Sequence, residues 1–215
     1  MADWRSNDYY QKLRVGKVDP KDLEFFKSEP STRKWLEHAQ YSPIITAARL
    51  TITDREDVFL NTTLKTDDTI SHWLALVSDL TFPHPGKSSQ TQSSRRPSGP
   101  ENPEVLIFFH LCKGVNSFRD TAHGGLLCTL LDETLATVVE LYRQTSSPNR
   151  EELYTARLDI SYRRPVKTPA VYIAKAWLEQ REGRKWIVKG LLESSQGEIC
   201  CNIDGLWVAA RPQRL

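Results

Sequence analysis

The feature that most constrains this chain is a histidine and two glycines directly before a long apolar stretch. His123, Gly124 and Gly125 precede residues 126–142, in which Leu and Val recur at helical spacing. Glycine lets the backbone turn tightly, and the first N–H groups of a helix have no partner within the helix. Because these donors and the helix dipole attract negative charge, we expect an oxyanion site at this helix start.

Asp132 lies nine residues after His123, on a helix face that is otherwise Leu and Val. An ionised carboxylate is costly in apolar surroundings unless it is paired or faces a cavity. Its neighbour Glu133 is rotated by about 100° around the helix, so we expect Glu133 on the surface. A carboxylate combined with main-chain donors is typical of sites that attack a carbonyl carbon. A purely structural Asp132 is the alternative.

The composition excludes several classes of protein. The 215 residues are 39% hydrophobic and 26% charged, as in a globular protein, and the net charge of +2 argues against a nucleic-acid partner. The sequence has neither an apolar run of about 20 residues nor a signal-peptide core. Four sparse cysteines and five scattered histidines show no metal-ligand spacing. We expect a cytoplasmic protein with no membrane partner and no metal.

Residues 83–103 divide the chain. They contain five prolines, five serines and two glycines, and no aliphatic or aromatic residue. Such a segment buries too little apolar surface to offset the entropy of ordering, so it predicts a flexible insertion. We therefore expect an N-terminal extension over residues 1–82, packed on a core domain over residues 104–215.

Local signals predict the elements of the extension. Asp19 and Pro20 are typical of a helix start, and Pro30 ends that helix; a second helix follows from Ser31. Residues 58–64 predict a strand. Thr66 predicts the cap of a further helix, whose apolar face would consist of Ile70, Trp73, Leu74 and Val77.

The order of strand and helix signals in the core domain predicts an α+β fold. A strand over residues 105–112 and the helix over 126–142 precede strands over 154–162, 170–178, 185–192 and 199–209. In the first of these four, Tyr154, Ala156, Leu158, Ile160 and Tyr162 alternate with Thr155, Arg157, Asp159 and Ser161. We interpret the four as an antiparallel meander, curved around the single central helix. A homodimer would cover the exposed sheet face and edge.

The segment from His123 to Glu133 resembles the hotdog-fold acyl-CoA thioesterases, particularly the phenylacetyl-CoA thioesterase type and its longer fungal members. A second match is Thr155-Ala-Arg-Leu-Asp-Ile-Ser-Tyr162-Arg163-Arg164-Pro165, which is similar to the family strand that ends in Tyr-x-x-Pro. Together the matches cover roughly residues 105–209, about half of the chain.

The resemblance implies roles for five residues. The N–H of Gly124 or Gly125 would polarise the thioester carbonyl, and His123 would orient the glycine loop or contact the thioester. Asp132 would act as general base on water or as the nucleophile, and Thr155 would hold the water. The site would form across a dimer, with the glycine loop from one subunit and Asp132 and Thr155 from the other.

Substrate-binding candidates lie on either side of these residues. Relatives carry Asn or Gln six residues before the histidine, where this chain has Ser117, with Asn116 one position earlier. Arg163 and Arg164 are candidates for the phosphates of coenzyme A or phosphopantetheine.

These residues together predict a homodimeric or tetrameric thioester hydrolase without a metal or other cofactor. Its substrate would be an acyl-CoA or an acyl group on a carrier protein. One alternative is release or cyclisation of a polyketide chain to a lactone or pyrone, in secondary metabolism, on the same scaffold. The other is a non-catalytic acyl-binding module.

Overall fold

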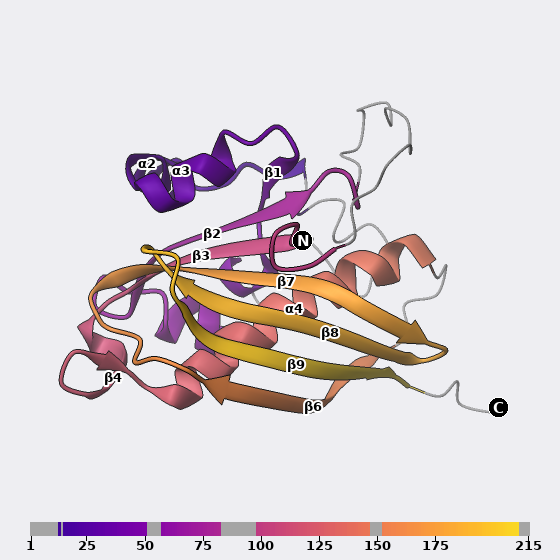
Figure 1. Ribbon diagram of the computed structural model, residues 1–215. Helices are drawn as coiled ribbons and strands as arrows, with labels where there is room; N and C mark the ends of the chain where they lie inside the picture. The colour runs from indigo at the N-terminus through magenta and orange to yellow at the C-terminus, as the bar shows by residue number, and fades with distance from the viewer. Residues whose placement is uncertain (1–12, 14, 51–56, 83–97, 147–151, 211–215) are drawn as a thin grey trace.

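The computed structural model describes residues 13, 15–50, 57–82, 98–146 and 152–210. In this part of the chain, a seven-stranded antiparallel sheet curves around one long helix (Figure 1). The strand order is β1-β2-β3-β7-β8-β9-β6. The strands are β1 (Tyr41–Ile44), β2 (Ile70–Ser78), β3 (Val105–Leu111), β6 (Leu153–Tyr162), β7 (Ala170–Glu182), β8 (Lys185–Ser194) and β9 (Ile199–Ala209).

This arrangement is the predicted hotdog fold, with one correction to the order of strands. The segments β7, β8 and β9 form consecutive antiparallel hairpins, as expected. Strand β6 does not join them at β7, however: it pairs with β9, and β7 pairs with β3 instead. The predicted four-strand meander is therefore a three-strand meander, and β6 forms the edge of the sheet.

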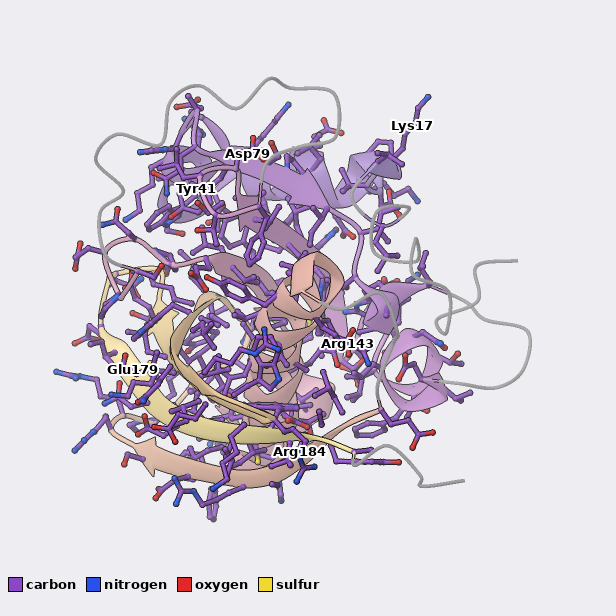
Figure 2. All side chains as sticks on the ribbon, turned by 90° about the vertical axis from the view of Figure 1, so that its right-hand side faces the viewer. Lys17, Tyr41, Asp79, Arg143, Glu179 and Arg184 are labelled. Atoms are coloured by element: carbon purple, nitrogen blue, oxygen red, sulfur yellow. The ribbon has the colours of Figure 1, made fainter. Side chains whose placement is uncertain are left out.

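The long helix α4 (Gly124–Ser146) packs against the concave face of the sheet. Figure 2 shows the helix nearly end-on, with side chains filling the space between helix and sheet. Its buried residues include Leu127, Leu130, Leu131, Leu135 and Val138, all predicted from the sequence. Among the described residues, no helix is long and apolar enough to span a bilayer.

Two glycines let α4 approach the sheet closely. A Cβ built at Gly190 of β8 would lie 2.8 Å from Lys175 O and 2.9 Å from Leu135 Cδ2. A Cβ at Gly205 of β9 would contact the Trp207 ring and Leu135 Cδ1. Any larger residue at either position would push Leu135, and with it the middle of α4, away from the sheet.

The prediction of a helix after Thr66 is wrong, because residues 70–78 form strand β2 between β1 and β3. Both faces of β2 are covered: Trp73 and Val77 pack in the core around α4, whereas Leu74 and Leu76 pack in a second cluster on the outer face. A strand buried on both sides lacks alternation, so its apolar spacing resembles that of a helix.

Residues 58–64 are also not the predicted strand: Phe59–Thr63 form the short π-helical turn η2. Arg49, at the end of the 3-10 turn η1 (Ala47–Arg49), donates to the carbonyls of Leu60, Leu64 and Ile70 and stacks over the Trp73 ring. These contacts hold η2 against the start of β2.

Two N-terminal helices cover the outer face of the sheet, where Figure 1 shows them above β2. Asp19 caps α2 (Pro20–Ser28) through Lys21 N, and α3 (Pro30–Leu36) follows; both helices start within one residue of the predicted positions. Phe26 of α2 is fully buried against Leu74, Leu76, Phe108 and Ile173. The segment predicted as an extension thus supplies both two strands of the sheet and its outer cover.

The two edges of the sheet differ in length and protection. Edge strand β1 has four residues and contains Pro43, which has no N–H to offer another strand. Edge strand β6 has ten residues, and most of them are exposed, including Tyr154 (59%) and Tyr162 (55%). A long exposed edge of this kind is a ready template for pairing with another chain.

Candidate active site

The residues directly before α4 are fixed by two main-chain hydrogen bonds. The 3-10 turn η3 (Lys113–Val115) and the hairpin of β4 (Asn116–Phe118) and β5 (Thr121–Ala122) precede it, beside the helix start in Figure 1. Ala122 N donates to Val166 O and His123 N donates to Val115 O, each at 2.9 Å. Because the two residues before the glycine turn are held in this way, the turn begins from a defined position.

His123 caps the helix with its side chain. The Gly125 N–H donates to His123 Nδ1 at 2.9 Å, so Nδ1 carries no proton in this arrangement and the neutral ring carries its proton on Nε2. The Gly125 N–H, one of the two predicted oxyanion donors, therefore already has an acceptor. The Gly124 N–H is the better candidate for the oxyanion donor.

The space around the two glycines is limited, more tightly at Gly125 than at Gly124. The positive-φ glycines of the described residues are Gly183 and Gly197, so neither Gly124 nor Gly125 uses a conformation that excludes other residues. A Cβ at Gly125 would lie 3.1 Å from His123 Nδ1, and a Cβ at Gly124 would lie 3.4 Å from Tyr162 Oη. Small residues here let two aromatic rings lie against the backbone of the helix start.

Asp132 is half-buried on α4, and Thr155 Oγ1 donates to its Oδ1 at 3.2 Å. Burial raises the pKa of Asp132 above its usual value, while the hydrogen bond from Thr155 lowers it in part. A carboxylate with a raised pKa is a better match to a general base that works near neutral pH.

A β-bulge between Thr155 and Arg157 turns Thr155 toward α4. With the strict alternation predicted for β6, Thr155 would lie on the opposite face from Leu158, Ile160 and Tyr162. The extra residue in the bulge shifts the alternation by one, so that Thr155 shares their face. Leu153, Leu158 and Ile160 accordingly pack against the core around α4.

Glu133 is not the surface residue predicted. It is partly buried, and burial raises its pKa to about 8, with further contributions from the nearby carboxylates of Asp57, Asp132 and Glu140. A rotation of 100° from Asp132 does not lead to solvent here, because the helix is covered on most sides. Burial and Asp132 also raise the pKa of the Cys128 thiol, which argues against a thiolate nucleophile.

The predicted substrate-binding residues lie near the helix start but are partly engaged elsewhere. Asn116 Oδ1 accepts a 2.5 Å hydrogen bond from Thr168 Oγ1, and Ser117 is exposed in β4. Arg163 and Arg164 are exposed after the end of β6, and Arg164 Nε lies 3.4 Å from Glu198 Oε1. Among the described residues, no group of His, Cys, Asp and Glu side chains is placed to hold a metal ion.

Tyr162 is the residue for which the sequence predicted no role of its own. Its hydroxyl donates to Gly124 O at 2.9 Å, so it contacts the peptide at the helix start directly. The Tyr-x-x-Pro pattern at the end of the β6 segment marks Tyr162 in the sequence. This pattern does not indicate its hydrogen-bond partner, which lies 38 positions away.

One copy of the chain does not bring Asp132 to the glycine turn. Eight residues of helix separate Gly124 from Asp132, which corresponds to about 12 Å along the axis and about 80° around it. A thioester carbonyl held at the Gly124 N–H must be about 3 Å from both donor and attacking water. The Asp132 of the same chain is too far away to activate that water.

Parts of the chain are similar to known proteins. Residues 120–201 match the sequence profile of the thioesterase superfamily. The chain is 25% identical over 174 residues to Verlamelin biosynthesis protein B of Lecanicillium sp, covering 70% of this chain and 71% of that protein. It is 34% identical over 114 residues to UPF0644 protein PB2B4.06 of Schizosaccharomyces pombe, covering 50% of this chain and 43% of that protein.

Solved structures with low sequence identity include a Bacillus halodurans protein with CoA, which is 23% identical with a TM-score of 0.44 and covers 49% of this chain and 66% of that one. They also include the E. coli PaaI protein from the phenylacetic acid degradation operon, which is 13% identical with a TM-score of 0.43 and covers 50% of this chain and 72% of that one.

Proposed function

We propose that this chain hydrolyses an acyl thioester at a site shared between two copies, because residues 120–201 match the sequence profile of the thioesterase superfamily. The observation that supports the proposal is the hydrogen-bonded pair of Asp132 and Thr155 on the helix that begins at the Gly124 N–H. Each protomer supplies the glycine turn for one site and the carboxylate for the other.

Edge strand β6 is the element through which the copies meet. Antiparallel pairing of two β6 strands about a two-fold axis near Leu158 brings the Tyr162 end of one strand beside the Thr155 end of the other. Since Tyr162 contacts Gly124 and Thr155 contacts Asp132, this pairing brings the two halves of the site together. It also covers the exposed edge.

In the proposed reaction, the thioester carbonyl oxygen accepts a hydrogen bond from the Gly124 N–H, which lies at the positive end of the helix dipole. The Asp132 carboxylate takes a proton from a water molecule that Thr155 helps to hold, and the resulting hydroxide attacks the carbonyl carbon. The carbon–sulfur bond breaks, and the thiol leaves with the proton. His123 holds the Gly125 N–H and so orients the turn.

The acyl carrier is either coenzyme A or a carrier protein, since both present the thioester on phosphopantetheine. Arg163, with its exposed guanidinium, is the better of the two predicted phosphate ligands, because Arg164 is already engaged by Glu198. The relative named for verlamelin biosynthesis favours a second candidate function, the release or cyclisation of a chain in secondary metabolism. Mass spectrometry of the products separates an acid from a lactone or pyrone.

The shared site is tested by subunit exchange. Asp132→Asn removes the base, and Gly124→Pro removes the N–H while keeping a residue that suits the first helical position. We expect each variant to lose thiol release from a panel of acyl-CoAs by about 100-fold or more. Gly124→Ala, which keeps the N–H, should retain measurable turnover.

Mixing the two inactive variants should restore activity, because a heterodimer contains one site with both an intact turn and an intact carboxylate. A mixture that exchanges subunits yet stays inactive would contradict the shared site. Thioester binding by the unaltered dimer without any thiol release would favour a non-catalytic acyl-binding module.

A further inference from the structure

Strand β6 is joined to α4 by two side-chain hydrogen bonds, one near each end of the strand. Thr155 donates to Asp132, and Tyr162 donates to Gly124 O. Their separation of seven residues would place them on opposite faces of a regular strand, and the bulge at Thr155/Arg157 brings both to the face toward α4. The strand therefore contacts both halves of the proposed machinery.

The peptide between Gly124 and Gly125 is held at both of its polar atoms. Its oxygen accepts from Tyr162 Oη at 2.9 Å, and its N–H donates to His123 Nδ1 at 2.9 Å. Because a peptide group is planar, two such contacts fix its rotation about the chain. The neighbouring Gly124 N–H, which belongs to the preceding peptide, then points in a defined direction.

The Tyr162 ring also restricts the space above the turn. A Cβ built at Gly124 would lie 3.4 Å from Oη, 3.5 Å from Cζ and 3.6 Å from Cε1 of Tyr162. The ring thus lies in van der Waals contact range over the first residue of the helix. It leaves little room for the turn to tilt toward β6.

We infer that Tyr162 is a positioning residue that aims the Gly124 N–H at the developing oxyanion, an inference that rests on the proposed thioester hydrolysis. It does not touch the substrate and takes part in no proton transfer. Its hydroxyl acts through the Gly124–Gly125 peptide, opposite to His123. Donors held in place before the reaction stabilise an oxyanion better than donors that must reorient.

The test compares Tyr162→Phe with Tyr154→Phe. Both remove one hydroxyl from an exposed tyrosine of the same strand, but Tyr154 Oη donates to Glu152 at 2.5 Å and not to α4. Loss of a neutral hydrogen bond corresponds to about a 2- to 12-fold effect. We expect Tyr162→Phe to lower kcat by that factor at unchanged KM and unchanged Tm, and Tyr154→Phe to leave kcat unchanged.

A double-mutant cycle with His123→Ala tests whether Tyr162 and His123 act on the same Gly124–Gly125 peptide. If Tyr162 and His123 hold the same group, the loss in the double variant should be smaller than the product of the two single losses. Losses that multiply independently, a normal kcat in Tyr162→Phe, or a loss confined to KM would each overturn the inference.

An activity-independent measurement separates this inference from the proposed reaction. Amide hydrogen exchange over residues 123–130 should be faster in Tyr162→Phe than in the unaltered chain and in Tyr154→Phe. A chain that hydrolyses no thioester but shows this difference would contradict the hydrolysis while leaving the restraint on the turn established. Equal exchange in all three proteins would overturn the positioning role even in an active enzyme.

Discussion

Thr155 Oγ1 lies 3.2 Å from Asp132 Oδ1 and donates to it across the contact between β6 and α4. The two residues are 23 positions apart in the sequence, and they meet because a bulge reverses the facing of the strand at this point. The same contact ties the protonation of Asp132 to the edge strand through which we expect two copies to pair.

Thr155→Val should move the acid limb of the kcat–pH profile to higher pH. Burial raises the pKa of Asp132 and the Thr155 hydrogen bond lowers it, so removing the hydroxyl raises the pKa further. Because the base must be deprotonated, activity is then lost at a higher pH as the solution is acidified. Thr155→Ser, which keeps the hydroxyl, is the control. An acid limb that stays in place or moves to lower pH contradicts the assignment of Asp132.

Glu133→Gln should make the chain more stable at alkaline pH. The pKa of Glu133 is about 8 in the folded chain and 4.5 in the reference state, so the folded chain binds more protons between these values. Stability contributed by this group is therefore lost as pH rises from about 4.5 to 8. The free energy of unfolding of the variant, relative to the unaltered chain, should increase between pH 5 and 8.5.

Urea unfolding at several pH values measures this difference. Glu24→Gln on the exposed face of α2 serves as the control. A constant difference between the Glu133 variant and the unaltered chain across this range would show that the carboxyl is already ionised at pH 5.

The part of the fold that the sequence predicts is the part set by local patterns. Helix α4 was predicted by apolar spacing over many turns, and the β7–β8 hairpin by strands that flank the turn before Lys185. Asp19 and Pro20 predicted the start of α2 because a cap depends on neighbouring residues alone.

What the sequence did not predict depends on packing between distant segments. Strand β2 lacks alternation because one of its faces packs in the main core cluster and the other packs against Phe26. The facing of Thr155 depends on a bulge with no distinctive residue, and the burial of Glu133 depends on what surrounds the helix. Asp132 and His123 could be identified from their spacing within one segment. The hydrogen bond from Tyr162 to Gly124 could not, because it joins residues 38 positions apart.

Gly205→Ala should destabilise the chain by about 1–3 kcal/mol. The added methyl group would contact the Trp207 ring and Leu135 Cδ1, at the point where β9 meets the middle of α4. Because Leu135 is fully buried, it has no free space into which to move. Gly99→Ala is the matched control, since a Cβ there meets nothing within 4 Å. Equal Tm values for the two variants would mean that Leu135 of α4 does not lie against Gly205.

Lys175→Met should cost about 3–5 kcal/mol in the free energy of unfolding, because it leaves the Glu193 carboxylate buried without its cation. Lys175 Nζ lies 2.7 Å from Glu193 Oε2, with only 8% and 12% of the two side chains exposed, and it lies 5.2 Å from the Trp35 ring of α3. The matching pair Lys189–Glu179 lies 3.2 Å apart with 41% and 45% exposed, and Glu179 is at the periphery of the molecule (Figure 2). For Lys189→Met we expect at most about 1 kcal/mol.

The double variant Lys175→Met/Glu193→Leu distinguishes the cost of an orphaned charge from the value of the pair. Replacing both ions by apolar residues of similar size removes two desolvation penalties together with their mutual attraction. We therefore expect the double variant to recover most of the stability lost in Lys175→Met, as measured by urea unfolding. The double variant could instead be as unstable as the single variant. In that case the attraction within the ion pair holds α3 on the outer face of the sheet, and the cost of an unpaired carboxylate does not explain the loss.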